Sequence, residues 1–281
     1  MSRQISQKLA FAVLTALAVV VVVPIVLLLV YVFVQGVSAI SWEFLTTFPS
    51  NGMKEGGILP AVIGTVVLIF GTAIVSIPLA IGAAVYLAEY ARDTWLTRTI
   101  RLAIINLAGI PSVVYGLFGL GLFVLFLKLG TSIVAGSLTL GLMTMPVVIS
   151  TAEESLLAVP QRFRVVSRSL GATRWQTIRQ VVLPNALPGI LTGVILGLER
   201  AAGETAPILF TVAAFYLPRL PSSPMDQTMA LPYHLYVIST QVPGMPLDVQ
   251  YGTALVLLVL VLSMNLVATI LRSRFRRRRQ W

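Results

Sequence analysis

Residues 185–207 read NALPGILTGVILGLERAAGETAP, and they place Glu199, Arg200 and Glu204 inside a long apolar run. An arginine at the centre of a membrane-spanning helix costs about 2.5–3.5 kcal/mol on insertion scales, so such a charge needs a partner or a function. The other long apolar runs of the chain contain no charged residue. The contrast predicts a polytopic membrane protein that handles an ionic species.

The composition is that of an integral membrane protein. Of the 281 residues, 57% are hydrophobic and 11% are charged, and the mean hydropathy is +0.92; a soluble domain carries about 25% charged residues. The chain has no cysteine and one histidine, His234, which excludes disulfides, thiol nucleophiles and zinc–thiolate sites. We therefore expect no metal and no other cofactor, and an intramembrane enzyme would lack the nucleophile–base pair it needs.

Six apolar runs reach the roughly 20 residues that a membrane-spanning helix requires. They are Leu9–Val34, Ile58–Ala88, Leu102–Leu127, Ile133–Ala152, Ala186–Leu217 and Tyr251–Leu271. The first run has about 26 residues, which is longer than the 7–15-residue core of a cleaved signal peptide, so we expect a retained helix. The fold class predicted is an all-α integral membrane protein with six transmembrane helices.

The basic residues predict the orientation in the membrane. Most of the 20 Lys and Arg residues lie before the first run, between the second and third, between the fourth and fifth, or after the sixth. Cytoplasmic loops carry such an excess, so the N- and C-termini are predicted to be cytoplasmic. The arginine-rich tail, residues 272–281, directly follows a spanning run and is expected to bind anionic lipid rather than nucleic acid.

Two connecting segments have distinct compositions. Residues 216–250, on the opposite side, are rich in proline and predict an irregular or re-entrant periplasmic cap in which His234 has a surface or packing role. Residues 153–184 predict two short helices, because Pro160 suits a first turn and Gly171 suits a C-terminal cap. Thr173 and Gln176 have the spacing of a capping box that starts the second helix, and Pro184 is expected to end it.

The second helix of this segment is expected to present one apolar face, formed by Trp175, Ile178, Val181 and Val182. A basic amphipathic loop could lie on the lipid surface, but two short helices with defined ends are better suited to binding in a groove on a partner protein. This segment resembles the E-A-A-x3-G-x9-I-x-L-P loop of ABC-importer permeases: Gly171 matches the glycine, and Val181-Val182-Leu183-Pro184, after nine residues, matches the I-x-L-P end. Residues 165–167 are Val-Val-Ser where that pattern has Glu-Ala-Ala, so no contact through that glutamate is carried over.

This resemblance implies that residues 153–184 are a coupling loop that docks on a separate ATPase subunit. The residues that it marks for ATPase coupling are Gly171, Ala172, Thr173, Trp175, Val181, Leu183 and Pro184. The chain itself would then not be an enzyme, because no P-loop is present and ATP hydrolysis would take place in the partner.

Residues 200–207, RAAGETAP, resemble the R-A-x-G-E-T-A-P motif of the phosphate-specific transport permeases. The proline-rich segment that follows and the overall length resemble the PstA type rather than the PstC type. The resemblance covers the chain from about Leu59 to the end and implies a type I ABC-importer permease fold. It also implies an importer of inorganic phosphate in the bacterial inner membrane, with a homologous PstC-like permease as heterodimer partner, two PstB-like ATPase subunits and a PstS-like periplasmic phosphate-binding protein. The alternatives are a permease for another oxyanion, such as sulfate, molybdate or tungstate, and an ATP-independent anion transporter.

The division into domains follows from these assignments. Residues 1–57 form an N-terminal transmembrane helix and periplasmic loop, residues 58–271 form the permease transmembrane domain, and residues 272–281 form the cytoplasmic tail.

Helical geometry places the motif residues on one face of the fifth run. At 100° per residue, a face within about 40° of one line contains the following five residues: Gly189, Gly193, Gly197, Arg200 and Glu204. The glycines allow close approach of another helix, and we expect the partner permease to meet this face. Two readings of the charges stay open: a structural ion pair, or a substrate pathway in which the guanidinium binds phosphate oxygens. Glu199 points about 120° away, and its role is unknown.

Overall fold

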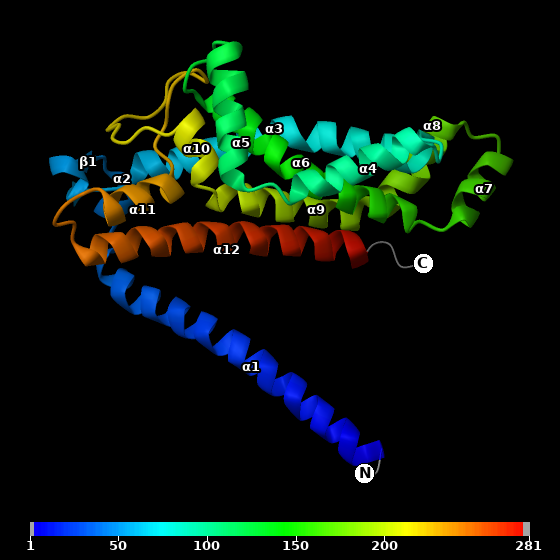
Figure 1. Ribbon diagram of the computed structural model, residues 1–281, viewed down its shortest axis with the longest axis horizontal. Helices are drawn as coiled ribbons and strands as arrows, with labels where there is room; N and C mark the ends of the chain where they lie inside the picture. The colour runs from blue at the N-terminus through cyan, green and yellow to red at the C-terminus, as the bar shows by residue number, and fades with distance from the viewer. Residues whose placement is uncertain (1–2, 278–281) are drawn as a thin grey trace.

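The computed structural model describes residues 3–277, and these residues are almost all helical (Figure 1). The longer helices are α1 (Arg3–Gly36), α3 (Leu59–Val85), α4 (Trp95–Ala108), α5 (Ser112–Gly119), α6 (Ile133–Leu157), α7 (Gln161–Ser169), α9 (Leu183–Gly203), α11 (Leu231–Thr240) and α12 (Leu247–Arg277). The shorter elements are η1 (Val37–Ala39), α2 (Trp42–Thr46), β1 (Pro49–Ser50), η2 (Asn51–Met53), β2 (Glu55–Gly56), η3 (Tyr86–Tyr90), η4 (Leu120–Phe126), α8 (Arg174–Thr177), η5 (Ile178–Val182) and α10 (Ala206–Thr211). Strands β1 and β2 form a two-stranded antiparallel sheet in which Pro49 pairs with Gly56.

Five helical stretches of the described chain are long and apolar enough to cross a membrane, and a bent pair supplies a sixth. The five are Gln7–Ala39, Leu59–Tyr90, Ile133–Leu157, Arg174–Gly203 and Leu247–Arg274. The pair consists of α4 and of α5 continued by η4, which meet at 103°. The protein is therefore a multi-pass membrane protein, and its third predicted run is broken into two helices.

The bend has a local cause. Gly109 caps the end of α4, and Pro111 precedes the first residue of α5. Proline has no N–H to donate and disfavours helical backbone in the residue before it, so a helix that reaches this point stops. Both short helices that result remain apolar, which is why the sequence pattern alone did not separate them.

The centre of the bundle is α6. In its most apolar part 67% of the residues are buried, whereas the figure for the stretch Arg174–Gly203, which contains α9, is 33%. Helix α6 packs between α3 and α9, and small residues allow the close approach. A Cβ added at Gly71 of α3 would lie 2.2 Å from Oγ of Ser137, and one at Gly141 of α6 would lie 3.1 Å from a methyl group of Val75. These contacts fix the position of α3 relative to α6.

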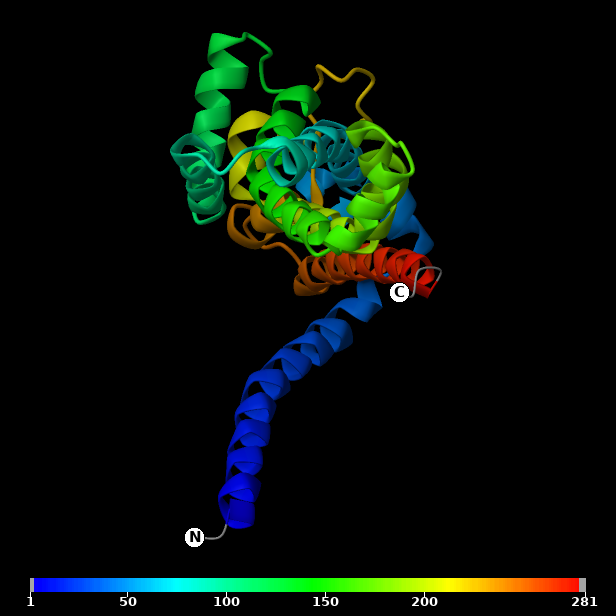
Figure 2. The same cartoon turned by 90° about the vertical axis from the view of Figure 1, so that its right-hand side faces the viewer.

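The long axis of the molecule has two different ends. The two termini, α7 and α8 lie toward one end, and α2, β1 and α11 lie at the other (Figure 1). Helix α1 leaves the body in both views (Figures 1 and 2) and contacts α12 near its own C-terminal end, where the rings of Tyr31 and Tyr251 meet edge to face at 5.5 Å. This arrangement agrees with termini that share one side of the membrane; which side is the cytoplasm stays a prediction. Residues 278–281 of the predicted basic tail lie outside the described residues.

The predicted periplasmic cap contains more regular structure than expected. Helix α11 lies inside residues 216–250, and its His234 is only 2% exposed. Burial lowers the pKa of His234 from 6.5 to about 4, because an apolar environment disfavours the charged imidazolium. The histidine therefore has a packing role, one of the two roles that the sequence predicts.

Candidate functional site

The predicted charged pair lies where α9 ends. The helix stops at Gly203, and Glu204 has extended backbone with φ −75° and ψ 135°. The prediction that the fifth run continues as one helix to Leu217 is therefore wrong, and Glu204 is not part of the helix that carries Arg200. The two side chains still meet: Nε of Arg200 lies 3.4 Å from Oε1 of Glu204.

The contact with Glu204 uses only the Nε group of the Arg200 guanidinium. The side chain of Arg200 is 34% exposed, and that of Glu204 is 16% exposed. Within the described residues the Nε contact with Glu204 is the single hydrogen bond of the guanidinium, so both terminal Nη groups are free to bind. A planar guanidinium with two free nitrogens has the geometry for a bidentate contact with an oxyanion.

Helix α5 packs beside this break, an arrangement that was not predicted from the sequence. A Cβ at Gly116 would lie 3.0 Å from the carbonyl oxygen of Ala206 and 2.8 Å from the ring of Phe210, so a glycine lets α5 rest directly on α10. Tyr115 is 7% exposed, donates a hydrogen bond to the carbonyl oxygen of Leu107 and lies within electrostatic reach of Arg200. The pattern gave no indication of this arrangement, because α5 is brought to α10 only by the 103° bend.

The glycine face of α9 has a different neighbour from the one expected. A Cβ at Gly189 would lie 2.2 Å from Oγ of Ser155, and one at Gly193 would lie 2.7 Å from Cβ of Thr151. Gly197 is similarly close to Val148. All three glycines therefore pack on α6 of the same chain, and the prediction that a partner permease meets this face is wrong.

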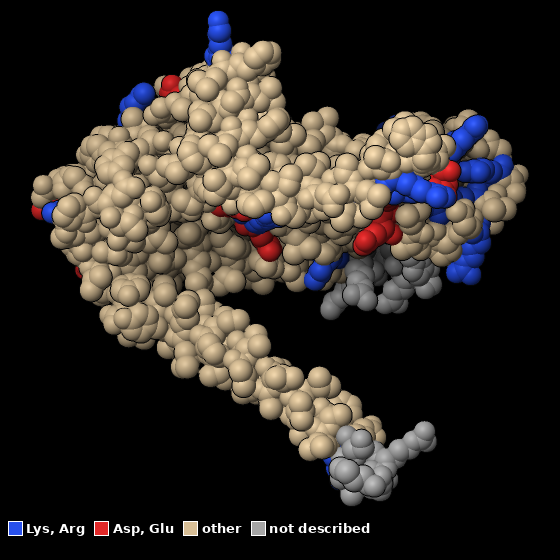
Figure 3. Space-filling view, viewed as in Figure 1, with Lys and Arg blue, Asp and Glu red and all other residues tan. Residues whose placement is uncertain are grey.

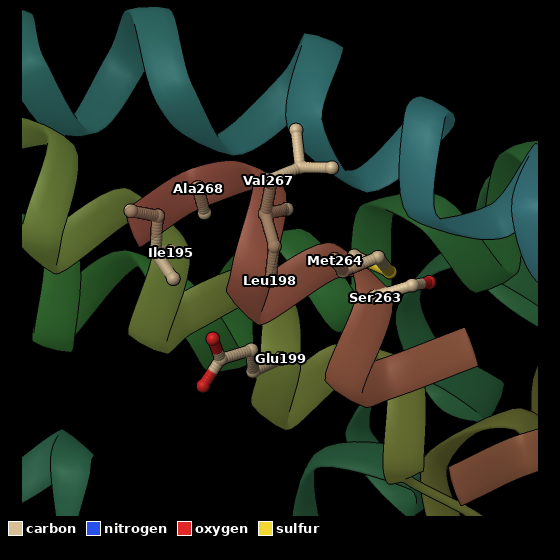
Figure 4. A pocket seen from close by; sticks show the side chains of 7 residues that line it. All are labelled: Ile195, Leu198, Glu199, Ser263, Met264, Val267 and Ala268. Atoms are coloured by element: carbon tan, nitrogen blue, oxygen red, sulfur yellow. The ribbon is translucent and has the colours of Figure 1, made fainter. Parts of the chain in front are cut away.

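Glu199 lines a separate, mainly apolar cleft of about 290 Å³ between α9 and α12 (Figure 4). Its neighbours on α12 include Ser263, Met264 and Val267. Its Oε1 atom is buried and makes no hydrogen bond within the described residues. The structure thus separates Glu199 from the Arg200–Glu204 pair, as the helical geometry predicts.

The two short helices predicted in residues 153–184 form a hairpin of α7 and α8. Gly171 has φ +86°, which favours glycine, and the capping box between Thr173 and Gln176 is complete. Large apolar side chains around this tip are exposed, by 55% to 84%: Val165, Val166, Leu170 and Trp175. Lys and Arg side chains gather at the same end of the molecule (Figure 3).

The remaining coupling residues lie away from the tip. Residues Arg174–Gly203 are one continuous helical stretch, so the prediction that Pro184 ends the second helix is wrong. The π-helical turn η5 directly precedes Leu183 and Pro184, and such a wide turn accommodates the ring that would clash in a regular helix. Val181, Leu183 and Pro184 are half-buried in this stretch, whereas Gly171, Thr173 and Trp175 are exposed and Ala172 is partly buried at the tip. Trp175 does not share the buried face of Ile178 and Val182.

A buried ion pair near this hairpin was not predicted from the sequence. Nη2 of Arg164 lies 2.6 Å from Oε1 of Glu89, and the side chains are 6% and 4% exposed. A second pair joins Arg101 to Glu153 at 2.7 Å. Glu89 directly follows the second apolar run, and Arg101 and Glu153 likewise adjoin the ends of apolar runs. Acidic and basic residues that adjoin the same side of several membrane-spanning helices are the sequence signal that could have indicated the pairs. Among the described residues no group of three or more His, Cys, Asp or Glu could hold a metal ion.

Comparison with solved structures identifies the fold. The chain superimposes on a bacterial ABC transporter involved in the import of the acidic polysaccharide alginate, with a TM-score of 0.69 and 14% identity over 97% of this chain and 99% of that one. The two chains therefore share one fold. The chain belongs to the family described as the binding-protein-dependent transport system inner membrane component, which matches residues 76–281.

Two relatives resemble nearly the whole chain. It is 35% identical to the probable ABC transporter permease protein YqgI of Bacillus subtilis, over 95% of each protein. It is 31% identical to the probable phosphate transport system permease protein PstA of Methanocaldococcus jannaschii, over 93% of this chain and 92% of the relative.

Proposed function

We propose that this chain is the PstA-type permease subunit of an ATP-driven importer that moves inorganic phosphate across the bacterial inner membrane. The name of the Methanocaldococcus jannaschii relative and the RAAGETAP motif support phosphate as the substrate. The observation that carries the proposal is the guanidinium of Arg200, which lies beside the break after α9 with two nitrogens free. In the empty pathway Glu204 neutralises Arg200, and a passing phosphate replaces the carboxylate at the Nη groups.

The partners follow from the same assignment. A PstC-like permease completes the pathway as a heterodimer, and a PstS-like protein delivers phosphate on the side of α2, β1 and α11. Two PstB-like ATPase subunits hydrolyse ATP, and one of them receives the apolar knob of Val165, Val166, Leu170 and Trp175. The knob and both termini are then cytoplasmic, and the tail, residues 272–281, binds anionic lipid. The permease alternates between two packings of its helices, and it performs no covalent chemistry.

Phosphate uptake and ATP hydrolysis in proteoliposomes that contain all partners test this function. The Arg200→Ala variant removes the guanidinium, and we expect uptake to fall by about 10- to 150-fold, which corresponds to the loss of hydrogen bonds to a charged group. Arg200→Lys keeps the charge but loses the planar fork, so its uptake should lie between the two. Arg98→Ala, at an exposed arginine far from the site and from the predicted docking side, is the matched control and should transport like the wild type.

Two results would contradict the proposal, and a third would change the role of Arg200. Wild-type uptake of sulfate or molybdate in preference to phosphate would show that the substrate is wrong. Normal phosphate uptake by an assembled Arg200→Ala transporter would show that Arg200 is not in the pathway. Failure of that variant to assemble, detected by co-purification of the subunits, would make Arg200 structural.

A further inference from the structure

Three arginines from three different helices bind a single turn of the chain, the π-helical turn η3 at the end of α3. Arg164 of α7 binds the carboxylate of Glu89. Arg174, at the start of α8, donates to the backbone carbonyl of Glu89. Arg101 of α4 donates to the carbonyl oxygen of Leu87 at 3.1 Å. Both helices of the hairpin are therefore attached to the same residue of α3's extension.

The geometry of η3 explains why it accepts so many donors. The N–H of Ala91 bonds to the carbonyl oxygen of Tyr86, five residues back, and the chain then leaves the helix in extended conformation. Carbonyl groups in the last turn of a helix have no partner within the helix. The arginines bind two of these carbonyls, at Leu87 and Glu89.

The Glu89–Arg164 pair is well satisfied. Nε of Arg164 donates to the same carboxylate at 3.2 Å, Nη1 donates to the carbonyl oxygen of Val159 at 2.5 Å, and Nη2 donates to that of Leu156 at 2.8 Å. The last two acceptors follow or end α6, so one guanidinium joins α3, α6 and α7. A bidentate, carbonyl-supported contact of this kind holds its partners in one orientation.

Arg174 adds a second contact for α8. Its guanidinium carbon lies 4.7 Å from the centroid of the Tyr90 ring, a distance at which a cation and an aromatic face attract each other. The backbone already connects the hairpin to α6 and α9. Leu87 shares a buried apolar cluster with Val159 and Val182, and the contacts with Glu89 and Tyr90 add polar, directional attachments between α3 and both helices of the hairpin.

We propose that Glu89 is a positioning residue of the transport cycle, because it fastens both helices of the hairpin to α3. When the ATPase moves the hairpin, Glu89 makes the end of α3 move with it. The inference rests on the proposed function in one respect: the hairpin is taken as the part that the ATPase moves.

The test measures the hairpin and α3 directly. The chain has no cysteine, so spin labels at Tyr86→Cys on η3 and at Arg168→Cys on α7, which replace exposed residues outside the apolar knob, are specific. The complete transporter in nanodiscs is examined by pulsed electron paramagnetic resonance, without nucleotide and with ATP and vanadate. In the wild type we expect one narrow label–label distance that is the same in both states. In Glu89→Gln we expect a broader distribution that changes with nucleotide.

Transport provides the second measurement. We expect phosphate imported per ATP hydrolysed to fall by about 2- to 30-fold in Glu89→Gln, the range by which networks of this kind change coupling. The matched control is Arg98→Gln, which breaks the exposed Asp93–Arg98 pair at the same end and should change neither measurement.

A second variant separates positioning from stability. Glu89→Gln with Arg164→Gln removes both buried charges, so it should assemble even where Glu89→Gln does not, yet its coupling should stay low. Arg174→Gln removes the attachment of α8 without leaving a buried charge unpaired. If both Glu89 variants fail to assemble, the label distance and the phosphate imported per ATP are measured in Arg174→Gln, and normal values of both would overturn the proposal.

The proposal is overturned if the label distance in the assembled variants equals that of the wild type, or if the distance changes while coupling is normal. Restored coupling in the double variant would also overturn it, because the pair would then only stabilise the fold. Failure of the wild type to import phosphate would contradict the proposed substrate alone, since the label distances need no substrate.

Discussion

Replacement of Gly193 by alanine tests which surface the glycines of α9 contact. The new Cβ would lie 2.7 Å from Cβ of Thr151 on α6, which is 0.7 Å short of the 3.4 Å at which ordinary contact begins. Neither atom is the end of a flexible side chain, so α9 and α6 must move apart. Overpacking of this kind costs about 1–3 kcal/mol. At about 2–4 °C per kcal/mol for chains of this size, the melting temperature of the chain without its partners should fall by about 2–12 °C.

The assay is thermal unfolding of the purified chain in detergent, followed by the fluorescence of its tryptophans. Gly82→Ala, in the interior of α3 with no atom within 4 Å of the new Cβ, is the matched control. It should leave stability unchanged or raise it by up to about 1 kcal/mol through helix propensity. If Gly193→Ala melts like the wild type but no longer binds its partner permease, the glycine face is a subunit interface and our account of α6 packing is refuted.

Three further predictions concern the buried charge, the histidine and the packing of α5 beside the site. Glu89→Ala leaves Arg164 buried without a counter-ion and should cost about 3–5 kcal/mol in denaturant unfolding, whereas an unchanged midpoint would mean that water reaches the pair. His234 stays neutral in the folded chain down to about pH 4, whereas its imidazole in the unfolded chain binds a proton near pH 6.5. The free energy of unfolding should therefore fall as the pH is lowered from 6.5 to about 4, by up to about 3 kcal/mol at 1.36 kcal/mol per pKa unit. This loss should be absent in His234→Gln. Gly116→Ala should displace α10 and reduce phosphate uptake with the subunits still assembled, whereas Gly121→Ala, which meets no atom within 4 Å, should transport normally.

The local chemistry of the chain was accessible from its sequence. Apolar runs of about 20 residues predict spanning helices because backbone polar groups must bond internally in lipid. The capping box at Thr173 and the left-handed Gly171 depend only on neighbouring residues, so the pattern predicted both. The meeting of Arg200 and Glu204 was also predicted, although through a regular helix that in fact ends at Gly203.

Long-range partners were not accessible in this way. A ridge of Gly189, Gly193 and Gly197 predicts close helix packing, but any helix with small or polar residues fits it equally well, and the pattern does not say that α6 is the helix. Glu89 and Arg164 are 75 residues apart, and neither lies in an unusual local motif.

The sequence by itself determined that this protein crosses the membrane several times, where its hairpin turns and which charges lie near its centre, because hydropathy and caps act over a few residues. The tertiary structure decided that α4 and α5 bend by 103°, that Gly116 rests on α10, and that three arginines converge on η3. These features depend on which side chains meet after the helices pack, and packing among many apolar helices is chosen by shape rather than by any single residue pattern.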